Sequence, residues 1–426
     1  MFSFLTKIKK TGSSLGPGII TGAADDDPSG IATYSQTGAQ FGYGQLWTAI
    51  FLLPLMIAVQ EASARIGAVK GKGIAAVVKE YFGKPVLFLV IGLILVANII
   101  NLGVDLGAMA AAANLLIPVP FVLLTIIFTV IILLIEIYTS YRPFARALKW
   151  LSLSLLAYPL TVLFVRQPWL QILKATFLPH LEFNLAFLFI ITGVVGTTIS
   201  PYMFFWQASE EIEEAREEHL IREDGTVFMN HHFMKRLRLD NLIGMVASQI
   251  ATWSIIVTTA TVLHGNGILD IKTAADAARA LEPLVSSFPN AGLIAKSIFA
   301  IGVIGLGLLA VPVLAGSAAY ALSEALGWKY GLDRKLKEAP GFYAIIITAT
   351  LVGLGLNFLG INPIQALVYT AVLNGIVCVP LLFIIGKIAG SKKIMGNYAS
   401  GLSSKIFVWL AFGVTLVAAV SLLFAR

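Results

Sequence analysis

The stretch ITGAADDDPSGIATYSQ, residues 20–36, places three consecutive carboxylates, a proline and a glycine in a segment flanked mainly by apolar or small residues. An ionisable group at the centre of a membrane costs roughly 2.5 to 3.5 kcal/mol on insertion scales and usually marks a functional site. If this segment crosses a membrane, Asp25, Asp26 and Asp27 therefore need a partner.

The composition of the whole chain is that of a polytopic membrane protein. Of its 426 residues, 58% are hydrophobic and 12% are charged, against about 25% charged residues in a typical soluble domain. The formal net charge of +7 comes from Lys and Arg in short clusters between apolar runs. Membrane topology explains this distribution, so nucleic acid is not an expected partner.

Eleven segments are long and apolar enough for membrane-spanning helices, which need about 20 residues each. We expect these helices at residues 16–39, 45–67, 85–114, 120–139, 148–165, 183–209, 241–263, 291–322, 342–358, 363–387 and 405–424. The lipid bilayer is thus an expected partner, and the sequence predicts no particular oligomeric state.

Basic residues are divided unevenly between the two sides that these segments define. With residues 1–15 as a cytoplasmic leader, the inner side receives basic clusters at 65–84, 142–149 and 329–337, whereas the outer side receives few basic residues. Because cytoplasmic loops carry an excess of Lys and Arg, we expect a plasma-membrane protein with a cytoplasmic N-terminus and an extracellular C-terminus.

Two of the segments are expected to be broken helices. Proline lacks a backbone N–H, and its ring clashes with the carbonyl four residues back. Pro28 therefore releases the carbonyl of Ala24, and Pro201 releases the carbonyl of Thr197. Such irregular backbone is tolerated at membrane depth only where it is buried in protein or lines a polar cavity.

The two breaks lie five helices apart, an odd offset that inverts one segment relative to the other. Residues 16–166 and 183–387 are therefore expected to form two inverted repeats of five helices, with their breaks meeting near the midplane. Residues 405–424 would add an eleventh helix. The prediction is a single transmembrane domain with the layout of a transporter.

The groups expected where the breaks meet are the Asp27 carboxylate, the carbonyls of Ala24 and Thr197, and the Ser200 hydroxyl. All are oxygen ligands, which suit hard cations such as Mg²⁺, Ca²⁺ or Mn²⁺. No histidine lies in a predicted span, so a zinc or copper site is not indicated. The cation would be the transported substrate, and no cofactor is expected.

Several motifs resemble those of the Nramp divalent-metal transporters. GPGIITGAADDDPSGIATYSQTGAQFGYGQLW (16–47) is similar to the family's first helix, where an Asp-Pro-Gly-Asn motif precedes a Gly-Ala-Gln-Phe-Gly-Tyr run. GTTISPYMFFWQAS (196–209) is similar to the sixth helix, where Met-Pro-His occupies the break. With further likeness at 280–310 and 360–372, the resemblance extends over most of the chain. It implies an all-α LeuT-like fold.

Departures from the family motifs change the expected chemistry of the metal site. Where the family has metal-binding Asp and Asn, this chain has Asp27 and Gly30, and Ser200 and Tyr202 replace the family's Met and His. Thioether sulfur favours softer transition metals, so its loss removes that preference. Since Mg²⁺ usually keeps several waters and uses one or two carboxylates, the resemblance implies a roomy oxygen site for a partly hydrated ion.

The acidic residues of the family's proton route are also replaced in this chain. Its two acidic residues in the third helix correspond here to Asn101 and Val104, while Asp105 either lines the path or pairs with a neighbouring helix. These replacements resemble the divergent Nramp-related magnesium transporter branch. The leading hypothesis is import of Mg²⁺, with Mn²⁺, down its electrochemical gradient by alternating access and without proton coupling.

The triple Asp is explained in part by this resemblance, which assigns the metal to Asp27. Successive helical positions fan out by about 100°, so all three side chains cannot face one ion in a regular helix. Asp26 and Asp25 are expected to attract the cation or hold its water shell. Alternatively, they face an aqueous vestibule or cap the half-helix.

Other functions and segments have competing interpretations. A proton-coupled Mn²⁺ or Fe²⁺ importer would use surviving Asp residues as its relay. A sodium-coupled organic-solute transporter would bind a carboxylate, which the Asp cluster repels. An intramembrane Mg²⁺-dependent prenyltransferase would need a second acidic motif within the membrane. The predicted spans contain none, so no enzyme is expected. Residues 208–240 are interpreted as a solvated connector at the inner surface, and Glu61 as the ion-pair partner of Arg65.

Overall fold

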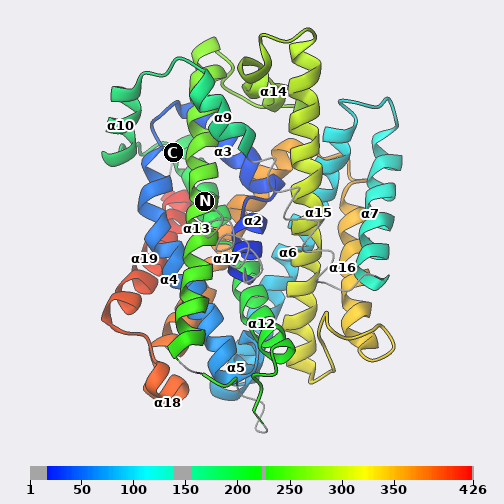
Figure 1. The fold of residues 1–426 in the computed structure, drawn as a ribbon, viewed down its shortest axis with the longest axis vertical. Coiled ribbons are helices and arrows are strands. Elements are labelled where there is room, and N and C mark those ends of the chain that lie inside the picture. The colour runs from blue at the N-terminus through cyan, green and yellow to red at the C-terminus, as the bar shows by residue number, and fades with distance from the viewer. Residues whose placement is uncertain (1–16, 139–155, 223–226, 230, 425–426) are drawn as a thin grey trace, which may run out of the picture.

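The computed structural model (Figure 1) describes residues 17–138, 156–222, 227–229 and 231–424. In these ranges the regular structure is helical, apart from one isolated antiparallel bridge between Ile221 and Val227. The all-α prediction is confirmed. The predicted leader at 1–15 and most of the predicted span at 148–165 lie outside the described residues.

The described part of the chain consists mainly of α-helices. Their bounds are α2 Pro17–Asp25, α3 Pro28–Phe41, α4 Trp47–Lys70, α5 Ile74–Tyr81, α6 Lys84–Ala113, α7 Phe121–Tyr138, α9 Ala157–Phe164, α10 Trp169–Phe177, α11 Leu185–Thr198, α12 Pro201–Glu217, α13 His231–Val262, α14 Ala274–Ala278, α15 Ala291–Leu326, α16 Pro340–Leu356, α17 Pro363–Gly390, α18 Lys392–Met395 and α19 Leu402–Phe424. Short 3₁₀ helices are η2 His264–Asn266, η3 Arg279–Val285 and η4 Gly396–Tyr398.

Most predicted spans agree with the helices in the part of the chain that the structure describes. Within that part of the chain, 8 helices are long and apolar enough to cross a membrane, and α16 is a shorter apolar helix. The broken pair α2 and α3 covers the first predicted span. The seventh span needs correction, because α13 begins at His231 rather than at residue 241.

Peripheral helices carry the surface that suits a bilayer. α7 and α19 lie at opposite edges of the molecule (Figure 1). In the most apolar 18-residue stretch of each helix, only 28% of α7 and 17% of α19 is buried. Leu134 of α7 is 51% exposed, and Val417 of α19 is 67% exposed. Such apolar surface is stable in lipid and unfavourable in water, so the protein is an integral membrane protein.

The broken helices lie inside this shell. α2 and α3, in dark blue, run through the centre of the molecule (Figure 1) and pack against α13. α11 packs against α17, and α12 packs between α4 and α15. Both breaks are therefore surrounded by continuous helices.

The predicted ion pair between Glu61 and Arg65 is confirmed. Arg65 Nη2 lies 3.0 Å from Glu61 Oε2. Arg238 of α13 lies 3.2 Å from Glu61 Oε1, which the sequence did not predict. The pair therefore joins α4 to α13 in addition to linking successive turns of α4.

α2, the first half of the first broken helix, is held by a very close backbone approach to α13. A Cβ built on Gly22 of α2 would lie 2.4 Å from the carbonyl carbon of Gly244 on α13. The obstacle is backbone, which cannot rotate away as a side chain does. Small residues at such crossings let membrane helices pack closely, so this contact requires glycine.

We expect Gly22→Leu to destabilise the protein by about 1 to 3 kcal/mol, the usual cost of overpacking. Thermal unfolding of the purified protein measures the effect as a lower Tm. Gly92→Leu is the matched control, because a Cβ at Gly92 in α6 meets nothing within 4 Å. Equal Tm values for the two variants would contradict the role given to the α2–α13 contact.

Candidate metal site

Both predicted helix breaks are present. α3 begins at Pro28 and α12 begins at Pro201. Proline suits the first position of a helix because its missing N–H has no intrahelical partner there. The preceding residues, Asp27 and Ser200, have extended backbones. The chain therefore leaves the helical conformation directly before each proline.

Asp27 occupies the first break and is 1% exposed. Its Oδ1 accepts hydrogen bonds from the Ser29 hydroxyl at 2.7 Å and the Gly30 N–H at 2.7 Å, which makes Asp27 the N-cap of α3. Its Oδ2 accepts from the Asn101 amide at 3.0 Å and the Tyr202 hydroxyl at 3.2 Å. The carboxylate therefore joins α3 to α6 and α12.

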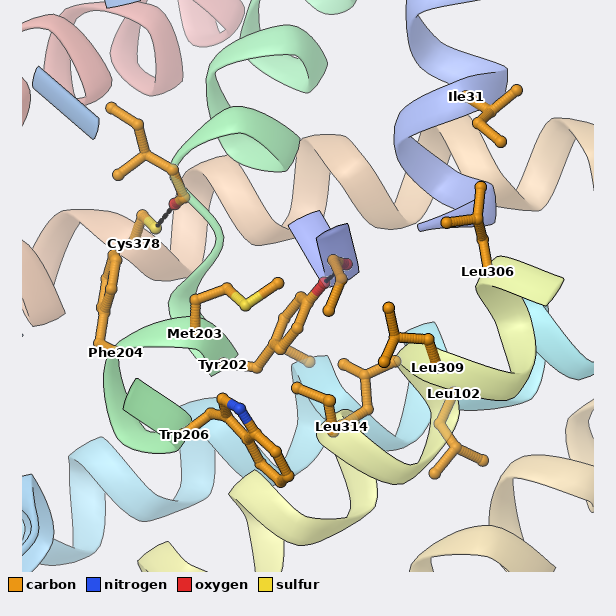
Figure 2. Close-up of a cluster of buried hydrophobic side chains, with 14 of the residues drawn as sticks. Ile31, Leu102, Tyr202, Met203, Phe204, Trp206, Leu306, Leu309, Leu314 and Cys378 are labelled. Carbon is orange, nitrogen blue, oxygen red and sulfur yellow. Dashed lines mark hydrogen bonds between the residues drawn. The ribbon is translucent and has the colours of Figure 1, made fainter. Parts of the chain in front are cut away.

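Tyr202 connects the second broken helix to the first. Its hydroxyl lies 3.0 Å from the carbonyl oxygen of Ala24, as the dashed line in Figure 2 shows. The same hydroxyl bonds Asp27, and the ring lies beside Leu309 and Leu314 (Figure 2). The sequence identified Tyr202 only as the replacement of a family histidine, whereas the structure makes it a direct neighbour of two predicted ligands.

The two released carbonyls are both engaged by hydroxyls. The Ala24 carbonyl accepts from Tyr202, and the Thr197 carbonyl accepts from the Ser200 hydroxyl at 2.6 Å. These hydroxyls replace the backbone N–H groups that the prolines lack. A hydroxyl oxygen that donates its proton still has lone pairs for a cation, so Ser200 is compatible with its predicted role.

Gly30 faces the second broken helix. A Cβ built on this residue would lie 3.2 Å from Thr197 Oγ1 and 3.2 Å from the carbonyl oxygen of Asp25. Thr197 Oγ1 is buried and has no hydrogen-bond partner among the described residues. The absence of a side chain at residue 30 therefore lets α3 and α11 come close together.

Asp25 and Asp26 turn toward α13. The Ser248 hydroxyl lies 3.3 Å from Asp25 Oδ2 and 3.3 Å from Asp26 Oδ1. The two residues are 0% and 1% exposed, so neither faces an aqueous vestibule in this conformation. Asp25 also ends α2, where the helix dipole disfavours negative charge. This cluster would be stabilised by a cation.

α6 contributes Asn101 and Asp105 to the same region. Asn101 binds Asp27 through its amide nitrogen. Asp105, one turn further along, is 0% exposed, and neither of its oxygens has a hydrogen-bond partner in the part of the chain that the structure describes. The alternative of a pair with a neighbouring helix therefore finds no partner among those residues.

Ser248 was missed by the sequence analysis. A signal for it existed, because Ser248 and Thr252 are four residues apart in an apolar segment, and residues at this spacing share one face of a helix. Nothing in the sequence indicated that this polar face of α13 is opposite the triple Asp.

The interpretation of residues 208–240 as a solvated connector is wrong for its first part. α12 continues to Glu217, between α4 and α15. Neighbouring helices bury three of its carboxylates, Glu210, Glu211 and Glu213. Gln207 donates to Glu211 at 2.8 Å and accepts from the Thr21 hydroxyl. A polar chain thus runs from Thr21 of α2 through Gln207 to Glu211 of α12.

The donor set of the candidate site is mostly backbone and hydroxyl oxygen. Among the described residues, no group of three or more His, Cys, Asp or Glu side chains is arranged to hold a metal ion. The first break instead brings the Asp27 carboxylate and the Ala24 carbonyl together at the Tyr202 hydroxyl, while the Thr197 carbonyl and the Ser200 hydroxyl bond to each other at the second break. Such oxygen donors suit a hard cation that keeps part of its water shell.

Comparison with known proteins identifies the family of the chain. A family model described as Nramp, "Natural resistance-associated macrophage protein-like", matches residues 18–425. The chain belongs to the Nramp family. It is 27% identical over 436 residues to the Nramp-type "Divalent metal cation transporter MntH" of Yersinia pestis (strain Pestoides F), covering 98% of this chain and 97% of that protein. It is 26% identical to MntH of Pectobacterium carotovorum over 402 residues, covering 91% and 88%.

Solved structures support the fold of this Nramp protein. The Eremococcus coleocola manganese transporter in complex with an aromatic bis-isothiourea substituted compound has a TM-score of 0.72 at 16% identity, covering 96% of this chain and 85% of that chain. MhsT in complex with L-phenylalanine has a TM-score of 0.58 at 12% identity, covering 96% and 97%. At such identities the likeness concerns the fold alone, and the predicted LeuT-like fold is confirmed.

Proposed function

We propose that this Nramp protein imports Mg²⁺, and Mn²⁺ as a second substrate, down their electrochemical gradients without proton coupling. The names of its relatives, divalent metal cation transporters, support a divalent cation as substrate. The observation that carries the choice of Mg²⁺ is that Ser200, an oxygen donor, occupies the N-cap of α12 beside the Thr197 carbonyl. A thioether at this position would favour softer metals.

The proposed site contains the Asp27 carboxylate, the carbonyls of Ala24 and Thr197, and the Ser200 hydroxyl, with Gly30 leaving its wall without a side chain. Asp26 and Asp25 add negative charge one and two residues earlier. Because hydroxyl groups and the Asn101 amide now hold these oxygens, the cation must displace some of them. Ion binding would therefore loosen contacts between the two broken helices, as alternating access requires.

The energy for import does not require protons. An inside-negative potential contributes about 2.3 kcal/mol per charge per 100 mV, and twice that for a divalent ion. The absence of an acidic side chain at positions 101 and 104 supports import without proton coupling. Asn101 holds Asp27 through a neutral amide, which has no proton to release near physiological pH.

Membrane orientation is part of the proposal. α5 and α18 lie at one end of the molecule, and α9, α10 and α14 lie at the other (Figure 1). The end with α5 and α18 contains the basic residues of the 65–84 cluster together with Lys392 and Lys393. We assign that end to the cytoplasm of a cell whose plasma membrane holds the protein, which leaves the C-terminus outside.

Uptake into sealed proteoliposomes tests the proposal. One batch contains a Mg²⁺ indicator and another a pH indicator, and a potassium diffusion potential sets the inside negative. We expect Mg²⁺ entry that increases with the potential and leaves internal pH unchanged. Protein-free vesicles under the same potential give the leak rate. Mn²⁺ entry alone, accompanied by acidification, would instead establish the proton-coupled importer.

A further inference from the structure

One face of α6 carries three buried polar residues. Asn98, Asn101 and Asp105 are spaced three and four positions apart, which places them on the same side of the helix. Their exposed fractions are 1%, 0% and 0%. Each carries oxygen, and the middle one touches the candidate metal site through Asp27.

The oxygens on this face lack donors. Among the described residues, Asn98 Oδ1, Asn101 Oδ1 and both carboxylate oxygens of Asp105 have no hydrogen-bond partner. The orientation of the two amides is set by their nitrogens, because Asn98 donates to the Leu314 carbonyl at 3.1 Å and Asn101 donates to Asp27 at 3.0 Å. These partners only accept hydrogen bonds, so each amide must turn its nitrogen toward them. The two amide oxygens are then left without a hydrogen-bond donor.

Of these groups, Asp105 has the largest free-energy cost of burial without a partner. A buried carboxylate without a hydrogen-bond partner is strongly unfavourable. Asp105 is one helical turn from Asn101, which donates to Asp27. A row of buried oxygens without donors matches the ligand preference of a hard cation.

We propose that Asp105, with the free Oδ1 of Asn101, forms a second binding station for the transported divalent cation. Asp105 is one helical turn from Asn101, the residue that contacts Asp27, toward the Ala113 end of α6. This inference rests on the proposed function and adds a place where the ion binds before it reaches Asp27. In the assigned orientation this station lies on the outer side.

The spacing favours one ion that moves between stations. Four residues of helix correspond to about 6 Å along the axis, and two divalent ions at that distance would repel each other strongly. Asn101 links the two stations, because its nitrogen binds Asp27 while its oxygen remains available beside Asp105.

Binding and uptake of Mn²⁺ and Mg²⁺ by the full chain test the second station. The variants are Asp27→Asn, Asp105→Asn and the double variant, with electron paramagnetic resonance of Mn²⁺ as the binding signal. Asp27→Asn should retain weak Mn²⁺ binding that the double variant loses. Asp105→Asn alone should raise the KM for Mg²⁺ about tenfold, the lower end of the effect of losing a contact to a charged group, with a smaller change in kcat.

Glu136→Gln is the matched control, because Glu136 of α7 is also buried and neither of its oxygens has a partner among the described residues. Its KM should equal that of the unmodified protein. Asp105→Glu should restore part of the lost affinity, which a merely structural role would not predict. In addition, Asp105→Asn should raise the Tm without metal and reduce the increase that Mg²⁺ produces, since a buried charge has been removed.

Unchanged KM in Asp105→Asn, or equal Mn²⁺ binding by Asp27→Asn and the double variant, would overturn the second station while leaving the proposed function in place. If the unmodified protein neither binds nor imports Mg²⁺ or Mn²⁺, the proposed function fails and the station fails with it. The two failures are therefore distinguishable.

Discussion

Asp27→Asn is expected to abolish Mg²⁺ uptake while leaving the fold intact. Asn and Asp are equally good N-caps, so the hydrogen bonds to Ser29 and Gly30 that begin α3 can persist. The variant loses the negative charge that holds the cation. The loss of affinity should exceed the roughly 10- to 100-fold effect of residues that only support a metal ligand.

Two measurements separate the functional from the structural role of Asp27. Initial Mg²⁺ uptake in proteoliposomes gives the transport loss, and thermal unfolding without metal gives the stability. Ser29→Ala is the matched control, because it removes one hydrogen bond to Asp27 and keeps the charge. It should retain most of the uptake. Substantial uptake by Asp27→Asn would show that the carboxylate is only a helix cap.

Ser200→Met is expected to change the preferred metal from Mg²⁺ to Mn²⁺. The substitution replaces the hydroxyl that contacts the Thr197 carbonyl with a thioether, a softer ligand that favours transition metals. We expect the ratio of kcat/KM for Mg²⁺ over that for Mn²⁺ to fall by about tenfold, equivalent to about 1.4 kcal/mol of differential binding. Competition uptake with both ions measures this ratio.

Met203 offers a control for this experiment. It is buried and lies beside Tyr202 (Figure 2), so it already places sulfur close to the site. Met203→Leu conserves volume and usually costs less than 1.5 kcal/mol, and the metal preference should not change. If Met203→Leu shifts the preference and Ser200→Met does not, selectivity resides in α12 at a different residue from the one proposed.

Local rules were sufficient to predict the broken helices. Pro28 and Pro201 remove a hydrogen-bond donor wherever the rest of the chain lies, so the breaks and the released carbonyls follow from the sequence alone. The apolar runs likewise predict the spanning helices, because a bilayer imposes a minimum length on each. The breaks also indicated Asp27 and the Thr197 carbonyl as candidate ligands, and the family motifs then assigned the metal to Asp27.

Contacts between distant segments depended on the tertiary structure. Asp27 meets Asn101 and Tyr202, and Asp25 meets Ser248, only because separate helices cross at the breaks. Charge pattern was also a poor guide to burial, as the acidic part of α12 shows. The sequence by itself determined where helices run and where they break, since these depend on neighbouring residues and the membrane; only tertiary packing decided which polar groups meet and which remain unpaired, since those contacts join residues far apart in the chain.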